Sequence, residues 1–304
     1  MKDKNKLVVG LVMKSLQADF FKVMQRGAEA FAAAHDRVDL ISVGTDSQTE
    51  FEAQIALVDR MADDGVDAIV VVPIDSKALV APVVRAVKRG ITVVNIDIRL
   101  DEEMLRAEGV SLTYVGPDNF SASYALAARL SSCLHAGDRV LMIEGLPVAE
   151  NARQRKAGFE KAISEARLVL VASEPADWET AKAADVFRRL YSEHKDIKAV
   201  YCCNDAMALG VIDVLRECGK LPGEVLVIGF DNDEVMRPLI EHGWLFGTVD
   251  AFGPQMAVEG IKRVLEIADG SPQGGVYATP YEIIDNRWPM RLLSERRSGA
   301  VSER

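Results

Sequence analysis

Polar and aromatic side chains recur in this sequence just after the runs of apolar residues that predict strands. Lys14 and Gln17 follow the first run, and Asp97 and Arg99 follow the fourth. Later runs are followed by Arg153, Trp178, Asn204 and Asp231. Carboxylates and amides accept hydrogen bonds from hydroxyls, Arg and Lys donate to oxygens, and aromatic rings stack on C–H faces. Together these residues indicate a site for a small polyhydroxylated ligand.

Several of these residues have a structural alternative that the sequence leaves open. Phe20 and Phe21 could both be core residues of the first helix, and Lys14 could be a solvated charge. Asp205 could simply cap the helix that follows it. Trp178 is expected to lie exposed on a loop unless it packs on something. Since Arg153 and Arg155 are two residues apart, only one of them is expected to face a ligand.

Signatures of enzymes and of metal sites are missing from the sequence. It contains no GxGxxG, GxxxxGK[ST], HExxH or GxSxG motif. The four histidines lie at least 48 residues apart, and the four cysteines form no CxxC pair. We therefore expect no catalysis, no cofactor and no bound metal.

Charge and hydropathy exclude further classes of function. Acidic side chains outnumber basic ones 46 to 36, which gives a net charge of −10. Such a surface repels nucleic acids and anionic lipids, so we expect no nucleic-acid partner. The longest apolar run, residues 68–74, is shorter than the ~20 residues that span a bilayer. No secretory signal is recognised at the start, so the chain is either cytoplasmic or a mature form.

Apolar runs alternate with helical patterns along the 304 residues, a length that fits two ordinary domains. The first half predicts strands at 6–13, 38–43, 68–72 and 92–96, with helices at 20–34, 51–63 and 78–89 between them. After residue 119 the rhythm restarts, with strands at 139–143, 168–172, 199–203 and 225–228 and helices at 121–134, 155–165, 179–194, 206–218 and 235–242. A helix at 255–268 and one extended piece at 277–284 complete the pattern. Solid apolar strands separated by helices predict α/β lobes with doubly wound parallel sheets.

Seven fragments, in this order, resemble one family. They are KSL…FF over 14–21, GVDAI and PIDS over 65–76, VNID over 94–97, VGPDN over 115–119, RQRKAGF over 153–159, NDAMALG over 204–210 and VIGFD over 227–231. From residue 6 to about 290 the chain resembles the type I periplasmic sugar-binding proteins of ABC transporters, in the ribose-binding-protein-like branch.

The resemblance implies two Rossmann-like lobes joined by a three-strand hinge, with a central ligand cleft. It predicts crossovers near residues 115–118, 247–250 and 280–283. The N-terminal lobe is then 1–116 plus 248–281, and the C-terminal lobe 117–247 plus 282–304. It also favours a periplasmic, mature form without its signal peptide.

The resemblance assigns ligand contacts to seven positions. Aromatic rings at Phe20, Phe21 and Trp178 would sandwich a sugar ring, while Asp97, Arg153, Asn204 and Asp231 would bind its hydroxyls. Four contacts of the ribose pattern are replaced, by Ala18, Val72, Ile98 and Ala251. We therefore do not predict ribose, and expect substitutes from Lys14, Gln17, Arg99 and Asp250.

These features predict a monomeric, non-enzymatic solute-binding protein. It would capture a monosaccharide or polyol, close around it and deliver it to the membrane subunits of an ABC permease. A ligand-sensing module without transport is an alternative, and a small-sugar enzyme is a weaker one. A LacI-type repressor is disfavoured because the sequence shows no helix-turn-helix and no basic patch.

Overall fold

Runs of Val, Ile and Leu form the strands of two separate six-stranded sheets in the computed structural model, which describes residues 6–285. The first sheet has the order β11-β5-β4-β3-β1-β2, and all its neighbours pair in parallel. Its strands are β1 (Leu7–Ser15), β2 (Val38–Thr45), β3 (Ala68–Val71), β4 (Thr92–Ile96), β5 (Thr113–Pro117) and β11 (Val276–Thr279). β3 and the last four residues of β4 are buried, as expected for parallel strands covered on both faces.

The second sheet repeats this arrangement with the order β12-β10-β9-β8-β6-β7. Its strands are β6 (Arg139–Glu144), β7 (Val169–Pro175), β8 (Ala199–Cys202), β9 (Leu226–Ile228), β10 (Gly247–Asp250) and β12 (Glu282–Asp285). Among the strands that the structure describes here, only the edge strand β12 departs from parallel pairing, because it runs antiparallel to β10. The shared strand order confirms the prediction of two doubly wound α/β lobes.

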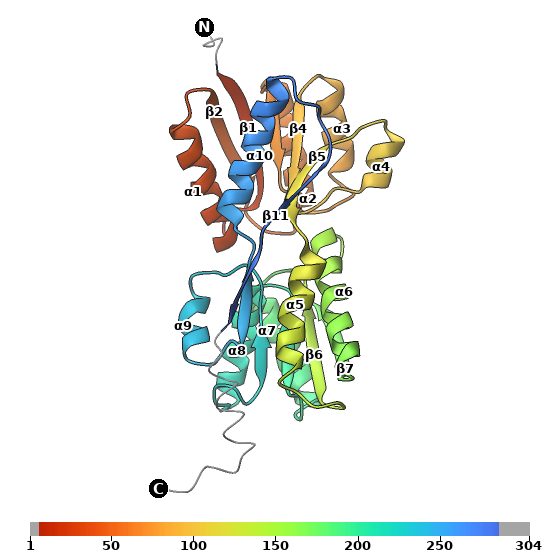
Figure 1. Ribbon diagram of the computed structural model, residues 1–304, viewed down its shortest axis with the longest axis vertical. Coiled ribbons are helices and arrows are strands. Elements are labelled where there is room, and N and C mark those ends of the chain that lie inside the picture. Colours follow the sequence, from red (N-terminus) through yellow and green to blue (C-terminus); the bar gives the residue numbers. More distant parts are fainter. Residues whose placement is uncertain (1–5, 286–304) are drawn as a thin grey trace, which may run out of the picture. The chain divides into compact units, whose positions relative to one another are not determined.

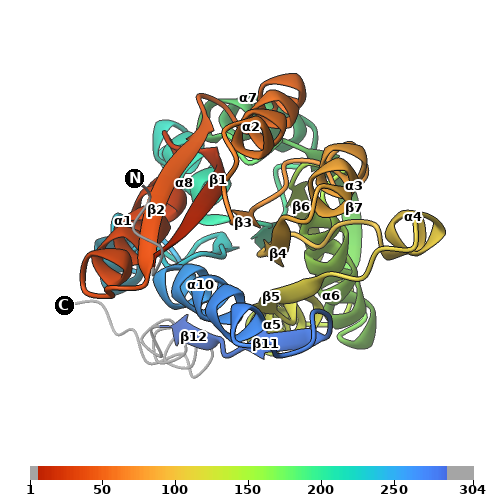
Figure 2. The same ribbon diagram turned by 90° about the horizontal axis from the view of Figure 1, so that it is seen from above.

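Helices cover the faces of each sheet (Figure 1). In the first unit, α1 (Asp19–Ala33) packs beside α10 (Gly253–Ala268), while α2 (Phe51–Asp63) and α3 (Val80–Lys88) lie together on the other side of the sheet (Figure 2). The second unit pairs α7 (Thr180–Glu193) with α8 (Asp205–Glu217). It also joins α5 (Asn119–Ser131) to α6 (Glu150–Glu165) through a hydrogen bond from Tyr124 Oη to Glu165 Oε2 of 2.7 Å. The short helices are α4 (Glu102–Ala107) and α9 (Met236–Glu241).

The chain passes between the two units several times. The first unit contains residues 6–118, 148–151 and 251–280, and the second contains 119–147, 152–250 and 281–285. Passages therefore follow β5, β10 and β11, the three strands that end at or next to these boundaries. Residues 1–5 and 286–304 of the predicted lobes lie outside the described residues. None of the helices between residues 6 and 285 is long and apolar enough to cross a membrane.

Two local predictions were wrong. The helix predicted to begin at 155 begins at Glu150, because its first turn is polar and its apolar periodicity starts only later. The extended piece predicted at 277–284 is two strands in different sheets, interrupted at Pro280 and Tyr281 where the chain changes units. The Asp101 side chain caps the start of α4 by accepting from the Met104 N–H.

Two buried amides satisfy backbone groups where the strands of the first sheet end. Gln54 of α2 is fully buried and donates to the carbonyls of Met13 at 3.0 Å and Val72 at 2.7 Å. Its Oε1 accepts from the Ile74 N–H at 2.7 Å. Asn95 of β4 does the same for the residues that follow this strand, donating to Ile98 O at 2.8 Å and accepting from Leu100 N at 2.9 Å. These bonds fix the strand ends that carry Lys14 and Asp97.

Replacing Gln54 by leucine is expected to destabilise the protein strongly. The change leaves three buried backbone groups without their partner, at about 1 kcal/mol or more each, so we expect a loss of roughly 3 kcal/mol in the free energy of unfolding. Urea denaturation followed by circular dichroism measures it. Gln25→Leu, at a partly exposed position of α1, is the matched control and should change stability by less than about 0.5 kcal/mol. A Gln54→Leu protein as stable as that control would contradict the assigned role.

Candidate functional site

Lys14 and two phenylalanines form one group at the carboxyl end of β1. Lys14 is only 2% exposed, so the alternative of a solvated charge is wrong. Its Nζ lies 5.3 Å from the centroid of the Phe21 ring, a cation–π arrangement. Phe21 is buried, Phe20 is half-buried, and the two rings meet edge to face at 5.2 Å. The group offers an ammonium and a partly exposed aromatic face.

Asp97 is held in place at the end of β4, whereas Arg99 contacts Glu102 and the Tyr114 ring. Asp97 is 3% exposed and has a left-handed backbone (φ 62°). Its carbonyl accepts a hydrogen bond of 2.7 Å from Tyr114 Oη. Arg99 forms an ion pair with Glu102 at 3.0 Å and stacks on the Tyr114 ring at 4.4 Å. Gln17 is exposed, and its backbone N–H donates to Ser15 Oγ.

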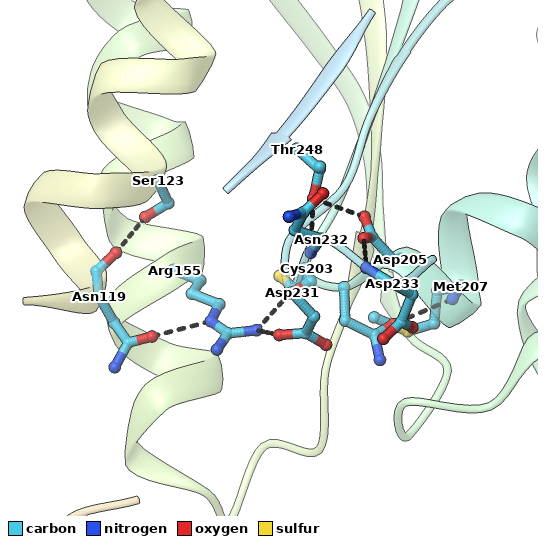
Figure 3. A network of polar contacts seen from close by, with 11 residues as sticks. Asn119, Ser123, Arg155, Cys203, Asp205, Met207, Asp231, Asn232, Asp233 and Thr248 are labelled. Atoms are coloured by element: carbon cyan, nitrogen blue, oxygen red, sulfur yellow. Dashed lines mark hydrogen bonds and ion pairs between the residues drawn. The ribbon is translucent and has the colours of Figure 1, made fainter. Parts of the chain in front are cut away.

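A buried arginine organises the corresponding edge of the second sheet (Figure 3). Arg155 is 3% exposed, and its Nε donates to Asn119 Oδ1 at 2.9 Å. Its Nη1 donates to the Cys203 carbonyl at 2.9 Å and lies 3.4 Å from Asp231 Oδ1. Three elements thus converge on one guanidinium: α5, the end of β8 and the loop after β9. The Arg155–Asp231 ion pair can donate to one hydroxyl of a ligand and accept from a neighbouring one.

Aromatic rings flank this guanidinium. The Arg155 Cζ lies 3.5 Å from the centroid of Phe230 and 5.6 Å from that of Trp178. Trp178 is 3% exposed, so the alternative that it packs against its neighbours is the one the structure shows. Its ring lies against Gly145, where an added Cβ would come within 2.1 Å of the indole. Gly145 is therefore required for Trp178 to approach β6.

Arg153 and Arg155 have different surroundings. Arg153 is exposed, and its Nη1 donates to the Pro147 carbonyl at 2.8 Å. Two residues on a helix point about 200° apart, so only one of them can face the strand ends. The structure groups Arg155, and not Arg153, with Asp231. The choice of Arg153 as a ligand contact stays a prediction.

Asn204, and not Asp205, caps α8. Asn204 Oδ1 accepts from the Met207 N–H at 2.9 Å, and the residue is 6% exposed. Asp205 is fully buried and accepts from Thr248 Oγ1 at 2.8 Å and from the Asp233 N–H at 2.9 Å (Figure 3). Burial, together with the nearby charge of Asp233, raises the pKa of Asp205 to about 7, although the hydrogen bonds that it accepts lower this pKa.

Asp250, predicted to replace a missing ligand contact, is half-buried at the end of β10. Its Oδ2 accepts from Asn232 Nδ2 at 2.9 Å. It therefore supports the same loop that carries Asp231.

Eight of the eleven residues predicted from the sequence fall into two groups, and Gln17, Arg99 and Arg153 lie outside them. Lys14, Phe20, Phe21 and Asp97 lie at strand ends of the first unit, and Trp178, Asn204, Asp231 and Asp250 at strand ends of the second. Sequence reasoning left Arg155, Asn119 and Asp205 out of its list of ligand-site residues. Asn151, on α6 one turn before Arg155, is 5% exposed, and its Oδ1 has no hydrogen-bond partner among the described residues. Because Asn151 lies four residues before Arg155 on α6, the two share a helix face, and this spacing could have indicated Asn151 from the sequence.

Within residues 6–285, no three His, Cys, Asp or Glu side chains are grouped to hold a metal ion. Burial raises the pKa of the Cys203 thiol to about 12, and also that of Cys202, so both behave as buried apolar groups and not as nucleophiles.

Two doubly wound lobes with hydrogen-bonding and aromatic residues at their strand ends define a bilobal small-molecule-binding protein. Residues 9–272 match the family model described as a periplasmic binding protein domain. The chain belongs to this family, which confirms the resemblance. Its members carry ligands without transforming them, so the chain is a solute-binding protein and not an enzyme.

Individual relatives agree with this assignment. The D-ribose/D-allose-binding protein of Pseudomonas aeruginosa is 39% identical, over 91% of this chain and 88% of its own length. The D-allose-binding periplasmic protein of Escherichia coli is 32% identical, over 84% of this chain and 83% of its own. An ABC transporter solute-binding protein from Actinobacillus succinogenes, solved with bound D-allose, is 31% identical with a TM-score of 0.86, covering 94% of this chain and all of that one.

The buried Asp205 predicts an unusual dependence of stability on pH. The folded protein retains this proton up to about pH 7, whereas the unfolded chain releases it near about pH 4, so the folded state binds more protons in between. The free energy of unfolding should therefore fall as pH rises from about 5 to about 8, by on the order of 3 kcal/mol. Urea denaturation of the ligand-free protein across this range measures it.

Asp205→Asn should flatten this dependence. Asp138→Asn is the control and should keep it. Asp138 also accepts a backbone N–H, from His135 at 2.8 Å, but it is only half-buried, just before β6. A wild-type stability that rises steadily with pH over the same range would contradict the prediction.

Proposed function

We propose that this protein captures an aldopyranose sugar for an ABC importer, and that D-allose is a better ligand than D-ribose. The observation that carries the proposal is the Arg155–Asp231 pair, buried beside Phe230 and Trp178 in a chain of the periplasmic binding protein family. Paired donor and acceptor groups next to aromatic faces match the alternating hydroxyl and C–H surfaces of a pyranose. The relatives named for D-allose support the choice of sugar.

The four positions that depart from the ribose pattern support D-allose further. Ala18, Val72, Ile98 and Ala251 are apolar, and the last three are buried. D-Allopyranose is D-ribopyranose with a hydroxymethyl group added at C5. It therefore needs the same ring contacts and an additional space, and the loss of polar side chains at these positions is compatible with such a space.

We propose that both groups of residues contact the same ligand. Lys14, Phe20 and Asp97 would provide the contacts of the first unit, and Arg155, Trp178, Asn204 and Asp231 those of the second. Because passages of the chain follow β5, β10 and β11, bending there would let the units close on the ligand. Closure that adds contacts only in the presence of ligand shifts a two-state population.

The family supports a proposal for the partner and the compartment. The named relative of Escherichia coli is periplasmic, and the solved relatives belong to ABC transporters. We propose that this chain acts in the periplasm and delivers its ligand to the membrane subunits of an ABC permease.

A panel of epimers tests the ligand. D-Allose should raise the melting temperature by several degrees at millimolar concentration, because a ligand that binds only the folded state stabilises it by mass action. The C2, C3 and C4 epimers, D-altrose, D-glucose and D-gulose, should bind at least about tenfold more weakly, since each misplaces one hydroxyl against buried polar groups. Isothermal titration calorimetry measures the affinities. Tighter binding of D-ribose than of D-allose would overturn the choice of sugar, and no binding of any aldose would overturn the sugar class.

Two neighbouring arginines test the site. Arg155→Gln should weaken D-allose binding by about 100-fold or more, because it removes a buried charge that pairs with Asp231. Arg153→Gln is the matched control, since this side chain is exposed, and should change the dissociation constant by less than about twofold. Circular dichroism of both variants checks that the fold is retained. The opposite order of effects would instead support Arg153 as the ligand contact.

A further inference from the structure

The loop between β9 and α9 has a strained backbone at the residue that faces Arg155. Asp231 has φ 120° and Asn232 has φ 55°, two consecutive residues other than glycine with positive φ. Such conformations persist only where surrounding contacts hold them. The Asp231 side chain reaches Arg155 from this loop, so the geometry of the pair depends on whatever fixes the loop.

Asp205 provides the central contact that fixes it. Its Oδ2 accepts from the Asp233 N–H at 2.9 Å, and its own N–H donates to the Phe230 carbonyl at 2.8 Å. Asp205, the first residue of α8, therefore bonds to the loop at Phe230 and at Asp233, on either side of the two residues with positive φ. Gly229 also permits the approach, because a Cβ there would lie 2.0 Å from Asp205 Oδ1.

The other carboxylate oxygen joins this loop to β10. Asp205 Oδ1 accepts from Thr248 Oγ1 at 2.8 Å, and the same hydroxyl lies 3.3 Å from the Asn232 N–H that donates to it. Asn232 in turn donates to Asp250 at 2.9 Å, the last residue before the chain enters the other unit. One buried carboxylate therefore links α8, the strained loop and a strand that leads to a passage between the units (Figure 3).

We propose that Asp205 is a positioning residue of the ligand site, whose carboxylate holds residues 230–233 so that Asp231 faces Arg155 and the ligand. This inference rests on the proposed function, because it takes Asp231 and Arg155 as ligand contacts. We assign no ligand contact to Asp205, because it is fully buried and its two carboxylate oxygens accept from Thr248 and Asp233.

Ligand affinity then depends on the charge of Asp205. The ionised carboxylate accepts from two donors at once, whereas a protonated oxygen is a poor acceptor and weakens one of these links. The nearby charge of Asp233 favours protonation of Asp205. The other charged groups joined to this loop are Asp231 with its partner Arg155, and Asp250. The Cys202 thiol of β8, also buried beside Asp205, stays neutral. Affinity should therefore fall with decreasing pH while the ligand-free protein becomes more stable.

Calorimetric titration with D-allose at two pH values tests the proposal. Wild-type affinity should be about fivefold weaker at about pH 5.5 than at about pH 8.5. Asp205→Asn keeps the shape of the side chain but cannot ionise, so its affinity should be low and equal at both pH values. Thr248→Val removes one donor and leaves the charge, and should weaken binding at the higher pH. The Asp138→Asn control should follow the wild type.

The outcomes separate this proposal from the proposed function. Wild-type affinity and an unchanged pH dependence in both Asp205→Asn and Thr248→Val would overturn the positioning role. If the wild type binds no D-allose, the choice of sugar is wrong, and the positioning role of Asp205 is then tested by NMR on the ligand-free protein. In that case the NMR amide resonance of Asp233 should shift with pH near neutrality in the wild type and in Asp138→Asn, but not in Asp205→Asn. A resonance that is insensitive to pH in the wild type would overturn the proposal.

Discussion

Backbone groups at the carboxyl ends of buried parallel strands lose their ladder partners but stay out of water, and side chains must satisfy them. Gln54 and Asn95 do this in the first unit, and Arg155 does it in the second by donating to the Cys203 carbonyl. The same strand ends carry the side chains proposed to bind the ligand. The contacts that stabilise the fold therefore also set the positions of Lys14, Asp97 and Asp231.

Charge is buried at these strand ends in ways that a solvated surface would not require. Lys14 lies against an aromatic ring, and Arg155 lies between Phe230 and Trp178 with Asp231 as its ion-pair partner. Removing such groups from water is costly, and hydrogen bonds recover the cost only in a fixed geometry. A rigid, partly desolvated set of donors and acceptors is suited to distinguishing sugars that differ at one hydroxyl.

Asp205 shows how stability and ligand binding can oppose one another in such a site. Burial favours its protonated form, whereas the loop that carries Asp231 is held best by the ionised form. The two effects act in opposite directions as the pH falls, because protonation favours the folded protein and weakens the hydrogen bonds that hold the loop.

The sequence by itself determined the two α/β arrays, the doubly wound lobes and the family, because apolar strand runs and seven ordered motifs are local signals. It also located most of the polar strand ends, including Asp97, Asn204 and Asp231. Only the tertiary structure decided that Arg155 and not Arg153 joins Asp231, that Trp178 is buried against Gly145, and that Asp205 supports a loop and does not cap α8. These outcomes depend on which neighbours converge from α5, β8, β9 and β10, and a pattern along one segment of chain carries no information about residues that approach it from distant segments.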